Sequence, residues 1–336
     1  MDRRILGVIH DPGACGMLLP VFRELSCTHG KNFFLYASPF VKNRLSSNQI
    51  SFKEIESDLA QDRLESVFSA SQPDIVLTGT SWGSQLEQRV RNLAGLRKIK
   101  SVTVVDYWAS YLERWEGRDL PVDQIQDEIC VIDDFMKKEM IENGFPSNQI
   151  YVTGHPYFEE LTLKAKPHSF SSIGKVLLLS EPLRDPFSSH LIDSRVHHVA
   201  EILQRLAENL NSRAEVHFKT HPKENPGLPS AFGSQSWNRL SFKLADSQLR
   251  SPDDFAKFDL VIGYQTTGLL EAAIMGIPTI SVPVAPLSGA VANAFRNAGI
   301  LVVEPQEKIE KIKFEFKATS KAPHRGATQV IMKFLD

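Results

Sequence analysis

The sequence has few cysteines, no long apolar run and no excess of charge of one sign. Its three cysteines, Cys15, Cys27 and Cys130, show no metal-ligand spacing, and their odd number gives no disulfide framework, which favours a reducing cytoplasm. No stretch reaches membrane-spanning length, and the apolar run after Met1 is too short for a signal peptide. We therefore expect peripheral membrane association at most. With 38 basic and 40 acidic residues, bulk charge cannot hold nucleic acid, so any anion must be bound locally.

Motifs that hold common cofactors are missing as well. There is no Asp-x-Asp motif and no cluster of histidines and cysteines, so nothing in the sequence demands a metal ion. The first apolar run is followed by glycines, but not with the three-glycine spacing of a dinucleotide-binding loop, which argues against a nicotinamide cofactor. The sequence predicts no cofactor.

Apolar, β-rich runs alternate with amphipathic helical stretches almost from end to end. This pattern is typical of an α/β fold with parallel sheets covered by helices, and 336 residues suit about two domains. The expected strands are Ile5–Ile9, Phe33–Ala37, Phe52–Ile55, Ile75–Thr78, Val102–Val105, Ile129–Ile132, Tyr151–Thr153, Val176–Leu179, Val216–Thr220, Leu240–Leu244, Leu260–Gly263, Thr279–Val282 and Ile300–Val303. The expected helices include Met17–His29, Leu59–Ala70, Gln85–Leu96, Asp134–Asn143, Ser194–Leu210 and Gly326–Leu335.

A composition shift divides the alternation into two Rossmann-like domains in tandem. Residues 164–174 are rich in serine and lack apolar periodicity, so they are interpreted as a linker between domains at 1–163 and 175–321. Residues 322–336 form a last helix that could cross back to the N-terminal domain.

The stretch from Asp259 to Val282 has the pattern strand, tight loop, helix, turn, strand. Gly263 ends the strand, and Thr266, Thr267 and Gly268 are residue types that open a helix, whose free N–H groups favour a phosphate. Glu271, one turn further, can point a carboxylate toward ribose hydroxyls. The alternative is a plain helix cap with a dipole-compensating acid.

Two further strand ends in the second domain carry polar residues. In the run from Glu215 to Lys223, alternation places His217, Lys219 and His221 on one face. His221 and Lys223 fall at the strand end and can meet a phosphate, whereas His217 is better explained by a solvent-facing position. Ser180, after the preceding strand, is a weaker candidate that either donates to a phosphate or begins a turn.

The loop from His10 to Gly16 follows the first strand, at the sheet edge where open α/β folds bind ligands. Gly13 and Gly16 permit close backbone approach. Asp11 can serve as a general base, with Asp106 as its rival; alternatively, Asp11 only starts the turn before Pro12. His155 is interpreted as a hinge or cleft residue.

Together these motifs resemble glycosyltransferases of the GT-B fold and the related UDP-N-acetylglucosamine 2-epimerases, across nearly the whole chain. The resemblance rests on the loop Pro12–Gly16, the segment Val152–Pro156 and the segment Gly263–Pro278. The pair His221-Pro222, followed by Gly263–Glu271, resembles bacterial polysialyltransferases, capsular Kdo transferases and glycerophosphate polymerases. The resemblance implies two domains facing across a cleft that holds the ligand.

Carried over residue by residue, the resemblance implies that His221 and Lys223 face the donor phosphate. Thr266 and Thr267 would bind it at the helix start, and Glu271 would bond the ribose. Tyr264-Gln265 departs from the serine or aspartate of many members.

The resulting hypothesis is a metal-independent transferase that moves a sugar from a CMP- or UDP-linked donor to a saccharide or lipid-linked hydroxyl acceptor, in surface polysaccharide or glycolipid assembly. Asp11 and His221 would be its catalytic residues. A nucleotide-sugar 2-epimerase or hydrolase of the same fold, and a non-catalytic nucleotide-sugar-binding protein, are the alternatives.

Overall fold

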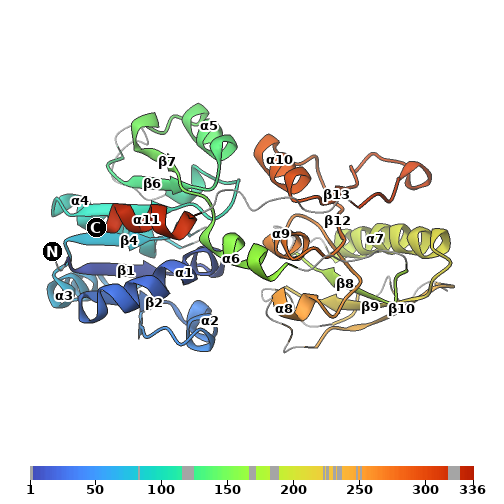
Figure 1. Cartoon of the computed structure of the whole chain (residues 1–336), viewed down its shortest axis with the longest axis horizontal. Coiled ribbons are helices and arrows are strands. Elements are labelled where there is room, and N and C mark those ends of the chain that lie inside the picture. Colours follow the sequence, from blue (N-terminus) through green and yellow to red (C-terminus); the bar gives the residue numbers. More distant parts are fainter. Residues whose placement is uncertain are drawn as a thin grey trace. The chain divides into compact units, whose positions relative to one another are not determined.

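The computed structural model describes residues 3–81, 84–115, 125–165, 172–181, 189–221, 224, 227–229, 232, 237–246, 249, 252–316 and 326–336. The chain forms two compact units (Figure 1). The N-terminal unit comprises Met1–Glu160 and Ala322–Asp336, and the C-terminal unit comprises Leu161–Lys321. The boundary therefore falls within helix α6 (Pro156–Lys164), just before the stretch that the sequence identifies as a linker.

The N-terminal unit is built on one parallel sheet with the strand order β3-β2-β1-β4-β5-β6-β7. This order reverses direction between β1 and β4, as in a Rossmann fold. The strands are β1 (Ile5–Ile9), β2 (Phe33–Ala37), β3 (Lys53–Glu54), β4 (Ile75–Thr78), β5 (Lys100–Val104), β6 (Glu128–Val131) and β7 (Ile150–Val152).

Helices connect these strands and complete the unit. They are α1 (Pro12–Thr28), α2 (Lys42–Ser47), α3 (Gln61–Ser71), α4 (Leu86–Leu96), α5 (Asp134–Glu142) and the start of α6. Every residue of β1 is buried, as expected of a strand that is paired on both sides and covered on both faces. The exit of β1 is thereby held on a rigid, fully buried element.

Helix α1 begins earlier than the sequence predicts. The expected loop Pro12–Gly16 is helical, because the Asp11 side chain caps the helix by accepting from the Gly13 N–H at 2.8 Å and Pro12 takes the first helical position. The glycines there suggested a loop. They serve close packing of side chains against the first turns of a helix instead.

The last helix, α11 (Ala327–Leu335), belongs to the N-terminal unit. Figure 1 shows this helix, in red, lying against the blue and cyan elements of that unit. The Glu159 carboxylate accepts from the N–H groups of Gly326 and Ala327 at the helix start, and Lys100 Nζ donates to the Phe334 carbonyl at its end, at 2.8 Å. Opposite charges thus meet the two ends of the helix dipole.

The C-terminal unit repeats the same plan in a six-stranded parallel sheet ordered β10-β9-β8-β11-β12-β13, with its reversal between β8 and β11. The strands are β8 (Lys175–Leu179), β9 (Ala214–Lys219), β10 (Leu240–Leu244), β11 (Leu260–Gly263), β12 (Thr279–Ser281) and β13 (Leu301–Val302). The helices are α7 (Ser189–Asn209), α8 (Pro252–Phe255), α9 (Thr267–Ile274) and α10 (Gly289–Asn297). The predicted α/β class with two Rossmann-like sheets is confirmed.

Short 3₁₀ turns occupy several connections: Gly30–Asn32, Pro39–Val41, Glu113–Trp115, Ser147–Gln149 and Ile309–Lys311. Strand β9 alternates as expected, with Ala214, Val216 and Phe218 buried and the residues between them partly exposed. Among the described helices, none is long and apolar enough to cross a membrane.

Candidate functional site

Most of the predicted site residues fall at the carboxyl ends of the strands that flank the two reversals. Asp11, Gly13 and Gly16 follow β1, whereas Gly263 and the α9 residues belong to or follow β11. Open α/β sheets bind ligands at this place, because the connections on either side of the reversal leave in opposite directions. Each unit therefore has one edge at which its candidate residues gather.

At the N-terminal edge, the two predicted glycines are approached by side chains. A Cβ on Gly13 would lie 2.1 Å from Asp106 Oδ2, and one on Gly16 would lie 2.5 Å from Arg44 Nη1. Arg44 also donates to the Pro12 carbonyl at 2.6 Å. Protein side chains therefore already lie close to both glycines, and the predicted contact of the glycines with a ligand stays a prediction.

Asp106, the rival base, lies at the same edge in a buried ion pair. Its Oδ1 is 2.7 Å from Arg114 Nη1, and both side chains are less than 10% exposed. Arg114 Nη1 also donates to the Thr80 carbonyl at 2.7 Å. Asp106 therefore has its charge balanced within the protein, whereas Asp11 is partly exposed and caps α1 through the Gly13 N–H.

Glu87, on α4, completes this edge and was missed in the sequence. Its side chain is fully enclosed: the Ser81 hydroxyl donates to one oxygen, and the His10 N–H donates to the other at 3.1 Å. Burial raises the pKa of Glu87 to about 7, and the nearby Asp11 carboxylate adds to the rise. Glu87 thus ties the loop after β1 to the loop after β4.

The raised pKa of Glu87 predicts a pH-dependent stability. The folded protein holds this proton more tightly than the unfolded chain, whose glutamate keeps its ordinary pKa of 4.5. The contribution is therefore present below pH 4.5 and is lost as the pH rises toward 7, by about 3 kcal/mol in the free energy of unfolding. Denaturant unfolding of wild type and Glu87→Gln across this window measures it.

Glutamine reproduces the protonated carboxyl, because its amide can donate to Ser81 and accept from the His10 N–H. The Glu87→Gln variant should therefore lose less stability between pH 5 and pH 8 than wild type does. Equal pH profiles of the two proteins would contradict the assignment.

The C-terminal edge contains the predicted helix start. Thr266 is the N-cap of α9, and its hydroxyl accepts from the Gly268 N–H at 3.4 Å. A Cβ on Gly263 would meet the Leu179 carbonyl oxygen at 2.9 Å, so the strand must end in glycine to pass β8 this closely. Thr267 and Glu271 are partly exposed. This geometry fits both a helix cap and a phosphate-binding start.

The two residues before the α9 cap are committed to protein contacts. Tyr264 is buried, and the Arg195 guanidinium lies over its ring at 3.9 Å from the centroid; burial raises the pKa of Tyr264 to about 12. The Gln265 N–H donates to Glu181 Oε2 at 3.1 Å. A phosphate contact in this loop therefore depends on the residues from Thr266 onward.

Within β9, the expectation that His217 faces solvent is wrong: its side chain is 14% exposed, bonds to Glu215 at 2.8 Å and packs edge-on against Phe258. The N–H of His221 donates to Glu224 Oε2 at 2.7 Å. The Ser180 hydroxyl donates to Glu224 Oε1 at 3.0 Å. The structure brings Ser180 and His221 together through a carboxylate that was missed in the sequence.

Other candidates have clear local roles or lie outside the described part of the chain. His155 is buried, and its Nδ1 accepts from the Phe158 N–H at 3.2 Å, so it caps α6. Burial lowers the pKa of His155 to about 3, so the ring is neutral. Lys223 lies outside the described residues, and its predicted contact stays a prediction. No group of three or more His, Cys, Asp or Glu within the described ranges could hold a metal ion.

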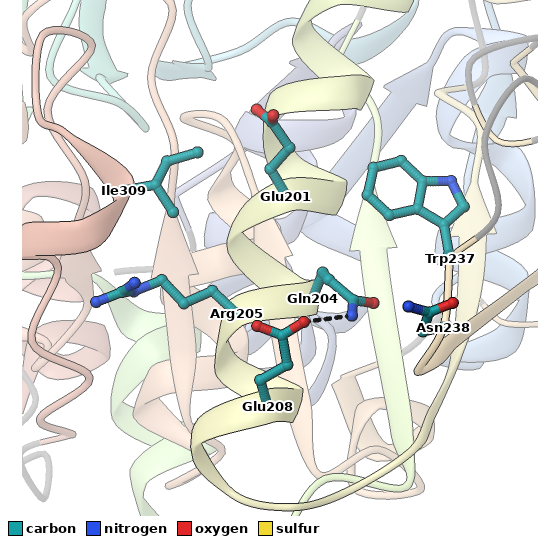
Figure 2. Close-up of a pocket in the computed structure, with 7 residues that line it drawn as sticks. All are labelled: Glu201, Gln204, Arg205, Glu208, Trp237, Asn238 and Ile309. Atoms are coloured by element: carbon teal, nitrogen blue, oxygen red, sulfur yellow. Dashed lines mark hydrogen bonds between the residues drawn. The ribbon is translucent and has the colours of Figure 1, made fainter.

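A hollow of about 390 Å³ lies elsewhere on the C-terminal unit (Figure 2). Its lining comes from the second half of α7, from the residues just before β10 and from a 3₁₀ turn: Glu201, Gln204, Arg205, Glu208, Trp237, Asn238 and Ile309. This is the amino edge of the sheet, opposite the edge with the candidate residues. It contains none of them.

Comparison with known proteins places the chain by fold. No family model and no curated protein matches its sequence. UDP-GlcNAc 2-epimerase from Neisseria meningitidis, solved with UDP-GlcNAc, is 14% identical, with a TM-score of 0.67 over 98% of this chain and 99% of that one. The Methanocaldococcus jannaschii 2-epimerase, solved with UDP-GlcNAc and UDP, gives the same values. Anabaena HepE, solved with UDP and glucose, is 12% identical, with a TM-score of 0.55 over 90% and 86%.

Sequence identities of 12–14% establish a shared fold, but not a shared reaction or substrate. The chain has the two Rossmann-like α/β units of the GT-B fold, and the solved structures similar to it include 2-epimerases and a glycosyltransferase, the group that the sequence resembles. The fold predicted from the motifs is confirmed.

Proposed function

We propose that this protein is an enzyme that transfers a sugar from a CMP- or UDP-linked donor to a hydroxyl acceptor, in the assembly of a surface polysaccharide or glycolipid. The C-terminal unit binds the donor, and the N-terminal unit supplies the base for the acceptor. The proposed reaction needs no metal ion. The proposal rests on the side chains available at the two sheet edges.

The observation that carries the proposal is the β11–α9 connection beside the sheet reversal. Strand β11 ends in Gly263, where a side chain would clash with β8, and α9 begins shortly after it. Thr266 is the N-cap of α9, and the partly exposed Thr267 is its first residue. Main-chain amides at such a start suit a phosphate, and Glu271 follows within reach of a ribose. Departure of the nucleotide leaves charge on the phosphate, which these amides and His221 stabilise.

The N-terminal edge supports a reaction with one base. Glu87 is enclosed with both oxygens bonded, and Asp106 is paired with Arg114. Asp11 is the partly exposed carboxylate of the three. Transfer to a hydroxyl requires a single proton acceptor, and Asp11 takes that role.

The same edge supports a second candidate, a nucleotide-sugar 2-epimerase. Epimerisation at carbon needs a proton to be removed and returned, and three carboxyl groups gather here, with the pKa of Glu87 raised to about 7. The enclosure of Glu87 and Asp106 favours transfer over this alternative.

Nucleotide binding tests the proposal directly. In a thermal-shift screen of CMP, UDP, GDP and CDP, the correct nucleotide at about 100 times its dissociation constant should stabilise the protein by about 2.7 kcal/mol. Glu271→Ala should abolish most of that shift, because the ribose loses its carboxylate partner. Glu310→Ala, an exposed glutamate outside the sheet edge, is the control. An undiminished shift in Glu271→Ala would contradict the ribose assignment.

The products separate the candidate functions. Nucleotide released only when an acceptor is present indicates transfer, and epimer formed without an acceptor indicates the second candidate. Donor binding with no turnover for any acceptor, unchanged in Asp11→Asn, indicates a non-catalytic binding protein.

A further inference from the structure

Glu224 holds two strand exits of the C-terminal unit together. One carboxylate oxygen accepts from the His221 N–H at 2.7 Å, just after β9, and the other accepts from the Ser180 hydroxyl at 3.0 Å, just after β8. These strands are neighbours, paired through Leu179 and Lys219 at their last residues. The carboxylate therefore acts where the regular strand pairing ends.

Glu224 also bonds to the main chain of His221 at two points. Its own N–H donates to the His221 carbonyl at 2.9 Å, while its side chain folds back onto the His221 N–H. Both main-chain polar groups of His221 are thereby bonded to one residue. The Ser180 N–H donates to the Lys219 carbonyl at 2.9 Å, and this bond holds the end of β8 against the end of β9. The backbone at His221 is set from both sides, and with it the origin of its side chain.

We propose that Glu224 is a positioning residue for the donor site: it fixes His221 for its contact with the donor phosphate. The inference deepens the proposed function and rests on it. Without the carboxylate, the His221 N–H loses a charge-assisted hydrogen bond and the Ser180 hydroxyl loses its acceptor. A displaced histidine then binds the phosphate poorly, since misplacement of a binding group is costly.

The same geometry bears on Ser180. The sequence leaves two roles open for it, donation to a phosphate or the start of a turn, and in the structure its hydroxyl donates to Glu224. In this proposal Ser180 acts through Glu224, as a support for the backbone at His221. Ser180→Ala should therefore weaken nucleotide binding in the same direction as Glu224→Gln, and by less.

A thermodynamic cycle tests the proposal on the full-length protein. UDP and CMP affinities are measured by calorimetry for wild type, Glu224→Gln, His221→Ala and the double variant. Each single substitution should weaken binding of the recognised nucleotide about tenfold. Because Glu224 acts through His221, the double variant should bind as weakly as His221→Ala alone, and not about a hundredfold more weakly than wild type.

The control is Glu215→Gln, at the other end of β9, whose carboxylate also has two partners, His217 and Lys243, each at 2.8 Å. It should leave affinity unchanged. The melting temperature of each ligand-free variant separates positioning from general destabilisation. Additive losses, or Glu224→Gln binding as tightly as Glu215→Gln, would overturn the role of Glu224. Wild-type protein that binds no nucleotide would instead overturn the proposed function, and this inference with it.

Discussion

Replacing Arg91 by leucine is expected to lower the free energy of unfolding of the N-terminal unit by about 3–5 kcal/mol. Arg91 is 3% exposed, and its Nε lies 3.4 Å from the Asp127 carboxylate, which is itself buried. Its other nitrogens donate to the Gly79 carbonyl at 3.0 Å and to Gln88 at 2.6 Å. Removing the guanidinium leaves Asp127 as a buried charge without this partner. Urea unfolding measures the loss.

Arg97→Leu is the matched control, because Arg97 also pairs with a carboxylate, Glu65, but on the surface. Exposed pairs contribute about 0–1 kcal/mol, so this variant should be close to wild type. Adding Asp127→Asn to Arg91→Leu should restore part of the lost stability, because it removes the unbalanced charge. An Arg91→Leu variant as stable as Arg97→Leu would show that the buried pair contributes little.

The positions of the strands could be predicted from the sequence because an apolar or β-rich run is a local signal. The expected strands Ile5–Ile9, Phe33–Ala37 and Leu240–Leu244 match the structure residue for residue, since each is an apolar or β-rich run with clear ends. The start of α1 was missed because glycines at 13 and 16 indicate a loop when read locally. In the structure these glycines leave room for the side chains of Asp106 and Arg44, which are distant in sequence.

In the candidate site, too, only the features with a local sequence pattern could be predicted. Thr266 and Gly268 are residue types that predict a helix start from the sequence alone, and in the structure Thr266 is the N-cap of α9. Glu87 and Glu224 carry no such local pattern, because one of the two groups that each bonds lies far along the chain: His10 is 77 residues from Glu87, and Ser180 is 44 residues from Glu224. Carboxylates that join separate strand exits become visible only once the sheet order is known.

Asp11→Asn should reduce turnover by about 10²–10⁴-fold while leaving donor binding and stability unchanged. Asp11 has two roles in this account, as the N-cap of α1 and as the acceptor base, and asparagine separates them. It caps a helix about as well as aspartate, so the bond from the Gly13 N–H survives. It has no basicity, so the acceptor proton has nowhere to go. Steady-state transfer rates and nucleotide affinity measure the two roles separately.

The chain offers a control in Asp133, the N-cap of α5, which accepts from the Met136 N–H at 2.8 Å and from Trp108 Nε1 at 2.7 Å. Asp133→Asn makes the same chemical change at a cap in the same unit; it gives up one of these two bonds and should leave turnover intact. If Asp11→Asn and Asp133→Asn were equally active, Asp11 would be a cap alone. Asp106 could not then take over the role unchanged, because its carboxylate is held in a buried ion pair with Arg114. A base would have to act after that ion pair opens, and transfer would become sensitive to Arg114→Lys.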